Sequence, residues 1–392
     1  MKILSTLLAF AIFAHVVRAG DTFGENIQLR GSLDNSRLQF ERAKKGRVAF
    51  IGGSITEMNG YRPMVCEILR ARFPETSFDF IDAGIASTCS TTGAARLDAD
   101  VLSKGPVDLF FIEFAVNDDQ DAAHTRAECI RGMEGIVRHA LRANPNMDIV
   151  ITFFVNEGML KTLQVKQAPL TIEAHDAVAQ RYSVSTVNLA KEVAEEISSG
   201  ALTWKIYGGV HPAKPGNALC AKMIETLFNR AWREALPKTA ALKAHELPPP
   251  LDEFNYESAR FIDPQRAEVK SGWTLGVPDW AKLAGSKRER FTKIPMLCAT
   301  ESGAEVSLPF EGKAIGAYVV AGPDAGIVEA RIDGGAPQAV NLFHHFSSGL
   351  HYPRTVMFAT ELNPGKHTLT LKISSETKSG GHAARIMQFV GN

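Results

Sequence analysis

The sequence predicts a three-layer α/β/α domain built around a parallel sheet, followed by a smaller β-sandwich domain. Three observations support this fold class. Apolar runs alternate with helical stretches from Arg47 to about Arg233, a proline-rich segment follows, and short alternating strands fill the remainder. Strands that alternate with helices form parallel sheets covered on both faces, because each crossover places a helix over the sheet. The length of 392 residues fits about two domains.

Apolar runs and their spacing predict the elements of the first domain. Strands are expected over 47–54, 78–84, 107–118 and 148–156, and a fifth strand is expected at the start of 184–193. Because their apolar residues recur on one face, helices are expected over 60–74, 127–145, 171–182 and 212–236. The run 107–118 is apolar on both faces, which is typical of a central strand in a parallel sheet.

The remainder of the chain differs in composition. Prolines at 237 and 248–250 indicate a linker, and beyond it two stretches, 326–343 and 365–374, alternate apolar and polar residues. Asp333 followed by two glycines is typical of a hairpin turn. Repeated short strands of this kind predict a β-sandwich. The expected segments are an α/β domain over 20–236, a linker over 237–255 and a β-sandwich over 256–392.

The first residues are typical of an export signal. Lys2 precedes an apolar stretch of about a dozen residues, and a small-residue cleavage site lies near Ala19. The stretch is too short for a membrane-spanning helix. We therefore expect a signal peptide over 1–19, an exported (periplasmic or secreted) protein, and no stable membrane insertion after cleavage. A retained membrane anchor is the alternative.

Charge and cysteine content argue against several classes of function. Lys and Arg total 43 and Asp and Glu total 43, so there is no basic excess to bind nucleic acid. The five cysteines are scattered without metal-ligand spacing and are expected mostly as small buried side chains. His344, His345 and His351 form a weak metal pattern, for which loop histidines are the simpler interpretation. We expect no metal and no cofactor.

Four residues are expected at one rim of the sheet. Ser54 ends the stretch GRVAFIGGS, Gly84 and Asn117 end the second and third strands, and His211 precedes the last helix. Ligands of parallel sheets bind at the carboxyl ends of the strands. Ser54 alone fits either a helix cap or a nucleophile. A histidine at the same rim, which can take its proton near neutral pH, favours the nucleophile.

The blocks IGGSIT, DAGIAST, AVND and GVHP, in this order, resemble the four blocks of the SGNH hydrolases, also called GDSL lipases/acylhydrolases. The resemblance covers roughly residues 46–232. It implies a flavodoxin-like domain and a serine ester hydrolase that needs no cofactor, with Ser54 as nucleophile and His211 as base. The amides of Ser54 and Gly84 and the side chain of Asn117 would then form the oxyanion hole, which stabilises charge developing on the substrate oxygen.

Two departures from the family pattern concern acidic residues. Gly53 stands where the first block usually has an Asp that takes no part in the chemistry. Gly208 stands three residues before His211, where the family usually has the Asp that orients the histidine. A backbone carbonyl or another carboxylate would then have to orient the ring. Glu113 and Asp118, near the end of the third strand, are the obvious replacements.

Glu113 also raises a question of its own, because it lies within an apolar strand and buried carboxylates need partners. An ion pair with Arg62 or another basic group is the simpler interpretation. Arg62 is alternatively a substrate contact. Both residues are therefore candidates for supporting the site.

Together these features predict a secreted serine esterase that removes small acyl groups, with acetyl expected, from a carbohydrate through an acyl-Ser54 intermediate. Export and the appended sandwich indicate the sugar, by analogy with family members that act on acetylated polysaccharides. The alternatives are a glycan-binding protein that kept the fold and lost turnover, and a lipase or thioesterase of the same family. In a third interpretation the β-sandwich is itself a glycan- or partner-binding module.

Overall fold

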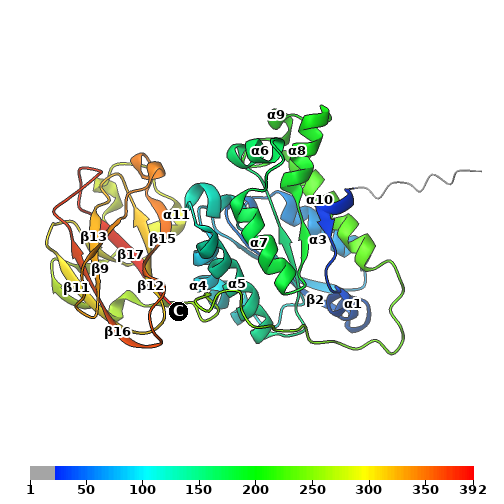
Figure 1. The fold of residues 1–392 in the computed structure, drawn as a ribbon, viewed down its shortest axis with the longest axis horizontal. Coiled ribbons are helices and arrows are strands. Elements are labelled where there is room, and N and C mark those ends of the chain that lie inside the picture. The colour runs from blue at the N-terminus through cyan, green and yellow to red at the C-terminus, as the bar shows by residue number, and fades with distance from the viewer. Residues whose placement is uncertain (1–22) are drawn as a thin grey trace, which may run out of the picture.

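Residues 23–392 are described by the structure, a computed structural model, and they form two domains that lie side by side (Figure 1). The first domain contains a six-stranded sheet covered by helices, and the second contains two antiparallel sheets. The predicted fold class, an α/β/α domain followed by a β-sandwich, is therefore confirmed. The predicted signal peptide over 1–19 lies outside the described residues.

The sheet of the first domain has the strand order β1–β6–β5–β4–β2–β3. All neighbouring pairs are parallel except the edge strand β1, which runs antiparallel to β6. The two residues of β1 are too few to produce a sequence pattern, whereas β4 and β5 lie within the predicted strands 107–118 and 148–156 and are buried throughout. The strands are β1 (Ile27–Gln28), β2 (Lys45–Gly52), β3 (Ser77–Gly84), β4 (Leu109–Glu113), β5 (Asp148–Thr152) and β6 (Ser185–Val187).

Helices cover both faces of this sheet (Figure 1). α5 packs against both α4 and α7, and α3 and α10 form a second group. Periodicity does not predict α4, whose small residues are buried because they contact both α5 and the second domain. Across residues 23–392, none of the helices combines the length and apolar character needed to cross a membrane. The helices are α1 (Asp34–Leu38), α2 (Ser54–Glu57), α3 (Tyr61–Arg72), α4 (Ser90–Asp100), α5 (Arg126–Ala143), α6 (Glu157–Gln164), α7 (Leu170–Arg181), α8 (Leu189–Ser199), α9 (Trp204–Tyr207) and α10 (Lys214–Ala231).

The second domain is a β-sandwich. One sheet has the order β15–β12–β17–β10–β9, with β7 beside β17, and the other has the order β14–β13–β16–β11–β8. Apolar side chains of both sheets form a common core. The expected hairpin is present, because β13 pairs with β14 around Asp333 and Gly334, which both have positive φ angles. The elements are β7 (Arg260–Ile262), β8 (Glu268–Ser271), β9 (Thr274–Gly276), α11 (Glu289–Thr292), β10 (Met296–Ala299), β11 (Glu305–Gly312), β12 (Ile315–Ala321), β13 (Ile327–Ile332), β14 (Gln338–Asn341), β15 (Tyr352–Ala359), β16 (Gly365–Ile373) and β17 (Ala384–Gly391).

The proline-rich segment of residues 237–255, here called the strap, is bound to the surface of the first domain. His245 Nε2 lies 2.8 Å from Asp148 Oδ1, and Arg138 Nη1 donates to the carbonyl of Pro248 over 2.7 Å. Figure 1 shows the strap running from α10 past α1 and then toward the sandwich. The segment that the sequence predicts as a linker therefore makes a fixed connection rather than a flexible tether.

The two domains also share an apolar core. Tyr256, Phe291 and Tyr318 of the second domain pack into the main hydrophobic cluster of the first. α4 contacts β7 and β15, where Thr92 Oγ1 lies 2.7 Å from Thr355 Oγ1. An apolar interface of this kind holds the domains in one relative orientation.

Candidate active site

Ser54 and His211 meet at the carboxyl end of the sheet. β2 ends at Gly52, Gly53 is the N-cap, and Ser54 is the first residue of the one-turn helix α2. The Ser54 hydroxyl does not cap the helix, because its Oγ is hydrogen-bonded to His211 Nε2 over 2.7 Å. Ser54 is half-buried and His211 is exposed, so both side chains reach solvent. The pair has the spacing of a nucleophile and its general base.

The direction of this hydrogen bond defines the tautomer of the histidine. For the hydroxyl to donate to Nε2, the proton of the neutral ring must be on Nδ1. Within residues 23–392, His211 Nδ1 has no hydrogen-bond partner, so no carboxylate or carbonyl of this part of the chain orients the ring. Ser54 and His211 are therefore a dyad in this structure.

The loop that carries His211 explains why the usual acid is absent. Gly208 follows α9 with a φ of 108°, and a Cβ at this position would lie 2.0 Å from the backbone nitrogen of Ala213. A residue with a side chain does not fit there unless the backbone moves, which excludes Asp. The other side of the loop is held by Asn217 on α10, whose Nδ2 donates to the carbonyls of Pro212 (2.5 Å) and Ala213 (3.1 Å).

Asn117 lies beside Gly53, the residue that precedes Ser54. It begins the short helix η4 (Asn117–Asp121) after β4, and its Nδ2 donates to Asp121 Oδ2 over 2.7 Å. A Cβ on Gly53 would lie 2.0 Å from Asn117 Oδ1, so glycine at position 53 leaves room for this amide. Because a carboxylate accepts hydrogen bonds, Asp121 orients the amide and leaves the second N–H of Nδ2 for another acceptor. The absence of Asp at position 53 thus has a local packing reason.

The turn after β3 supplies backbone N–H groups to the same rim. β3 packs closely against α2, because a Cβ on Gly84 would lie 2.2 Å from the backbone nitrogen of Glu57. The N–H of Gly84 donates to Asp82 Oδ1 over 3.0 Å, so the predicted oxyanion donor already has an acceptor. Within the described turn 84–88, the N–H of Ser87 has no acceptor, and its φ is 67°. This amide, to which the family resemblance assigns no role, is the better candidate donor.

Glu113 is buried and does not orient His211. Thr56 Oγ1 donates to its Oε2 over 3.2 Å, while Oε1 has no partner among the described residues. Burial raises the pKa of the Glu113 carboxyl to about 8, which keeps it mostly protonated at neutral pH. The predicted ion pair between Glu113 and Arg62 is wrong, because the guanidinium of Arg62 binds Asp82 instead.

Asp118 is also directed away from His211. Its Oδ2 accepts a hydrogen bond from Ser90 Oγ over 2.6 Å and lies 2.9 Å from His175 Nε2. Burial alone would raise the pKa of the Asp118 carboxyl, but the imidazoles of His124 and His175 outweigh it and lower the pKa. The prediction that Asp118 orients His211 is wrong, because this carboxylate joins the start of α4 to α7.

Arg62 on α3 supports α2, the helix that begins with Ser54. Its Nη2 lies 2.6 Å from Asp82 Oδ2, and its Nε donates to the carbonyl of Thr56 over 3.1 Å. The guanidinium thereby connects α2, α3 and β3 below the rim. A direct contact between Arg62 and substrate stays a prediction.

Two overlapping groups of side chains in the described chain come close enough to hold a cation. They share one carboxylate and consist of Cys89, Asp118 and His124, and of Asp118, Cys129 and His175. The oxygens of Asp118 already accept hydrogen bonds from protein groups, so neither group is an open set of ligands. We assign no metal role to them.

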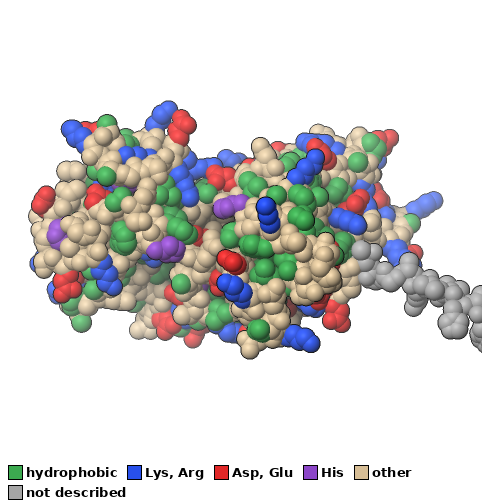
Figure 2. All heavy atoms as spheres, turned by 90° about the horizontal axis from the view of Figure 1, so that it is seen from above, with side chains coloured by type: hydrophobic (Ala, Val, Ile, Leu, Met, Phe, Trp, Pro, Cys, Tyr) green, Lys and Arg blue, Asp and Glu red, His purple; other side chains and the backbone are tan. Residues whose placement is uncertain are grey.

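Other features outside the rim match simpler expectations. All five cysteines are free, and all but Cys298 are buried, as small apolar side chains should be. The rings of His344 and His345 pack against each other at the start of the short helix η7 (His345–Ser348), with centroids 4.0 Å apart. Figure 2 shows acidic and basic side chains interspersed over one face of both domains, without a basic patch on that face.

Comparison with known proteins gives a family match for part of the chain and a similarity of fold for nearly all of it. The model of the GDSL-like lipase/acylhydrolase family matches residues 50–219. Two crystal structures of a two-domain esterase (CEX) active on acetylated mannans, one co-crystallized with mannopentaose, are 22% identical to this chain. They cover 94% of this chain and 97% of the esterase, with TM-scores of 0.75 and 0.76. The similarity of fold thus extends through both domains. Comparison with curated proteins found no match.

Proposed function

Because residues 50–219 form a domain of the GDSL-like lipase/acylhydrolase family, we propose that this protein is an exported serine esterase that removes acetyl groups from a polysaccharide. Members of this family, as its name states, hydrolyse acyl esters. The proposal assigns the nucleophile to Ser54 and the general base to His211. The observation that carries it is the 2.7 Å hydrogen bond between Ser54 Oγ and His211 Nε2.

The first half-reaction would transfer the acetyl group to the enzyme. His211 Nε2 takes the hydroxyl proton while Ser54 Oγ attacks the ester carbonyl carbon. Negative charge then develops on the carbonyl oxygen, and we assign its stabilisation to the amides of Ser54 and Ser87 and to Asn117 Nδ2. When the tetrahedral intermediate collapses, the C–O bond to the sugar breaks. The sugar oxygen takes the proton from His211, and acetyl-Ser54 remains.

The second half-reaction would release acetate. A water molecule gives a proton to His211 Nε2 and attacks the carbonyl carbon of acetyl-Ser54, and the same donors stabilise the second tetrahedral intermediate. Collapse breaks the bond to Oγ, and His211 returns the proton to Ser54. The protons balance over the cycle, so the reaction requires no further group.

The carbohydrate part of the proposal rests on domain arrangement and on the N-terminal sequence. An esterase active on acetylated mannans has the same fold over both domains. A signal-like pattern over 1–19 would bring the enzyme to polysaccharides outside the cytoplasm. At 22% identity the similarity is one of fold, so acetylated mannan is the substrate class to test first by analogy.

A glycan-binding protein without turnover is the second candidate. The observation that favours it is that Nδ1 of His211, an exposed residue, has no acceptor within residues 23–392. In serine proteases, a compromised orienting acid lowers kcat by about 10⁴-fold. A dyad that is not oriented by other means would therefore turn over slowly.

Hydrolysis by the full chain and two variants distinguishes the candidates. We expect wild type to release acetate from acetylated mannan and to cleave p-nitrophenyl acetate faster than the octanoate. Ser54→Ala should lower both rates by at least roughly 10³-fold, whereas Ser103→Ala, at an exposed serine of the same domain, should leave them unchanged. Equal rates in wild type and Ser54→Ala would refute the esterase. If wild type and Ser54→Ala both bind mannan, and neither cleaves esters nor reacts with a fluorophosphonate probe, the protein is a glycan-binding protein without turnover.

A further inference from the structure

We propose that the β-sandwich sets the geometry of the oxyanion hole, with Tyr352 as a positioning residue for the esterase reaction; this inference rests on the proposed function. Tyr352 is the first residue of β15, and its hydroxyl donates a hydrogen bond to Asp121 Oδ1. The other oxygen of Asp121 accepts the N–H of Asn117 Nδ2 over 2.7 Å. Two hydrogen bonds therefore connect the second domain to a side chain assigned to the oxyanion hole.

All three members of this relay are shielded from solvent. Tyr352 is 1% exposed, Asn117 3% and Asp121 8%. Hydrogen bonds are stronger in such surroundings than in water, and a bond to a carboxylate is stronger than one between neutral groups. Because Tyr352 holds Oδ1, rotation of the Asp121 carboxylate is restricted, and Oδ2 stays directed at the amide of Asn117.

Two arginines of the sandwich hold the other segments of the rim. Arg288 Nη1 donates to the carbonyl of Ala86 over 2.8 Å, and its Nη2 donates to Ser87 Oγ over 2.9 Å. Arg290 Nη2 lies 2.7 Å from a carboxylate oxygen of Glu57, the last residue of α2. The helix α2, the turn 84–88 and η4 each carry a proposed oxyanion donor, and each receives a hydrogen bond from the second domain. The sandwich thus contacts every segment on the oxyanion side of the site.

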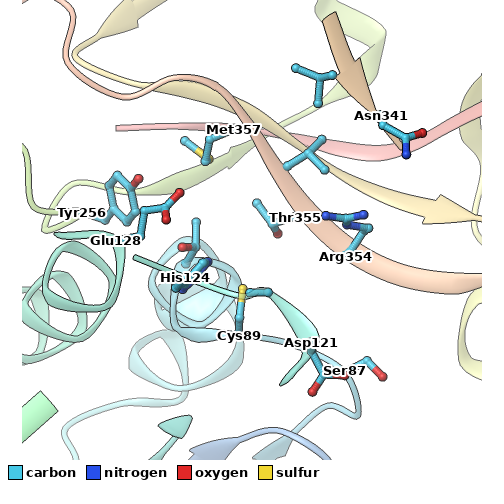
Figure 3. Close-up of a pocket in the computed structure, with 14 residues that line it drawn as sticks. Ser87, Cys89, Asp121, His124, Glu128, Tyr256, Asn341, Arg354, Thr355 and Met357 are labelled. Carbon is cyan, nitrogen blue, oxygen red and sulfur yellow. The ribbon is translucent and has the colours of Figure 1, made fainter. Parts of the chain in front are cut away.

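A cavity of about 190 Å³ lies beside the relay and leaves space next to the Asp121 side chain (Figure 3). Asp121 and Ser87 lie on one side of the cavity, and Arg354 and Thr355 of β15 lie on the other. Side chains that border a cavity have fewer packing neighbours to limit their rotamers. Tyr256 lines the same cavity, but its buried hydroxyl has no partner among the described residues, which makes it a matched control.

Kinetics of single-atom variants test the proposal. Tyr352→Phe removes the hydroxyl and keeps the ring. Because complete loss of an oxyanion donor costs about 10²–10³ in kcat, we expect this indirect change to lower kcat for p-nitrophenyl acetate about tenfold, with KM within twofold of wild type. Asp121→Asn should lower kcat at least as much. Tyr256→Phe, which removes an equally buried hydroxyl from the same cavity, should retain the wild-type kcat.

Two further readouts separate positioning from folding and from the proposed function. Titration of reactive Ser54 with a fluorophosphonate probe should give the same number of sites in Tyr352→Phe as in wild type, so that the loss lies in the rate per site. A loss of kcat that matches a loss of titratable sites would overturn the inference, as would wild-type kcat in both Tyr352→Phe and Asp121→Asn. An inactive wild type would overturn the proposed function, and this inference with it.

Discussion

Replacing Gly208 by Asp would restore the residue that the SGNH pattern usually has three positions before the catalytic histidine. The structure nevertheless predicts a destabilised protein with no gain in kcat. Gly208 has a φ of 108°, and its Cβ would lie 2.0 Å from the backbone nitrogen of Ala213. The new carboxylate can therefore be accommodated only if the loop that carries His211 moves.

The expected loss of stability has two parts. A side chain in the left-handed backbone region costs roughly 1–2 kcal/mol, and forcing extra atoms into a packed region costs about 1–3 kcal/mol. Gly208→Ala should therefore lower the unfolding free energy by roughly 2–5 kcal/mol. Gly209→Ala is the matched control, because Gly209 has a φ of 82° but no atom within 4 Å of its Cβ position. Gly209→Ala should lose only the roughly 1–2 kcal/mol that a side chain costs in the left-handed backbone region.

Thermal melting and steady-state hydrolysis of p-nitrophenyl acetate measure both effects. We expect Tm to fall further in Gly208→Ala than in Gly209→Ala, and Gly208→Asp to show the same loss of Tm with kcat at or below that of wild type. A Gly208→Asp variant with wild-type Tm and a higher kcat would refute the reasoning, because it would show that the position accepts an orienting acid.

Three further predictions concern the buried carboxyl, the oxyanion side and the base. Burial raises the pKa of the Glu113 carboxyl to about 8, so as pH rises the unfolded chain loses this proton before the folded protein does. The unfolding free energy of wild type should therefore fall relative to that of Glu113→Gln between about pH 5 and 8, by at most ~1.4 kcal/mol per pH unit. Urea unfolding that gives the two proteins the same dependence of unfolding free energy on pH would contradict this. Gly53→Asp should displace the Asn117 amide and lower kcat by up to about 10²-fold with little change in KM, and steady-state kinetics showing wild-type kcat would rule this out. Asn217→Ala should loosen the His211 loop and cost about 1–2 kcal/mol of unfolding free energy, so that an unchanged kcat and Tm would argue against a positioning role.

The fold and the dyad could be predicted because they depend on local patterns. Alternating strands and helices specify a parallel sheet, and its carboxyl ends bring loops together, so Ser54 and His211 could be paired although 157 residues separate them. α4 was beyond such reasoning, because its small residues form no apolar stripe and are buried by tertiary contacts with α5 and with the second domain.

The oxyanion side was less predictable, because it depends on which acceptor each N–H finds. The carboxylate of Asp82 takes the N–H of Gly84, and Ser87 adopts a positive φ that its residue type does not indicate. The acids near the third strand show the same limit. Asp118 is engaged by Ser90 and His175, whose positions follow only from the packing of helices.

The relay between Asp121 and Tyr352 joins residues 231 positions apart, which has a consequence for biosynthesis. At ribosomal rates of about 5–20 residues per second, roughly 10–50 s pass between the two codons. His211 is synthesised within that interval, so in its later part the nascent α/β domain holds both residues of the proposed dyad, but the residue that ties the asparagine in place has not been made. Esterase activity would then mature last, after the sandwich has docked, which limits ester cleavage by unfinished chains.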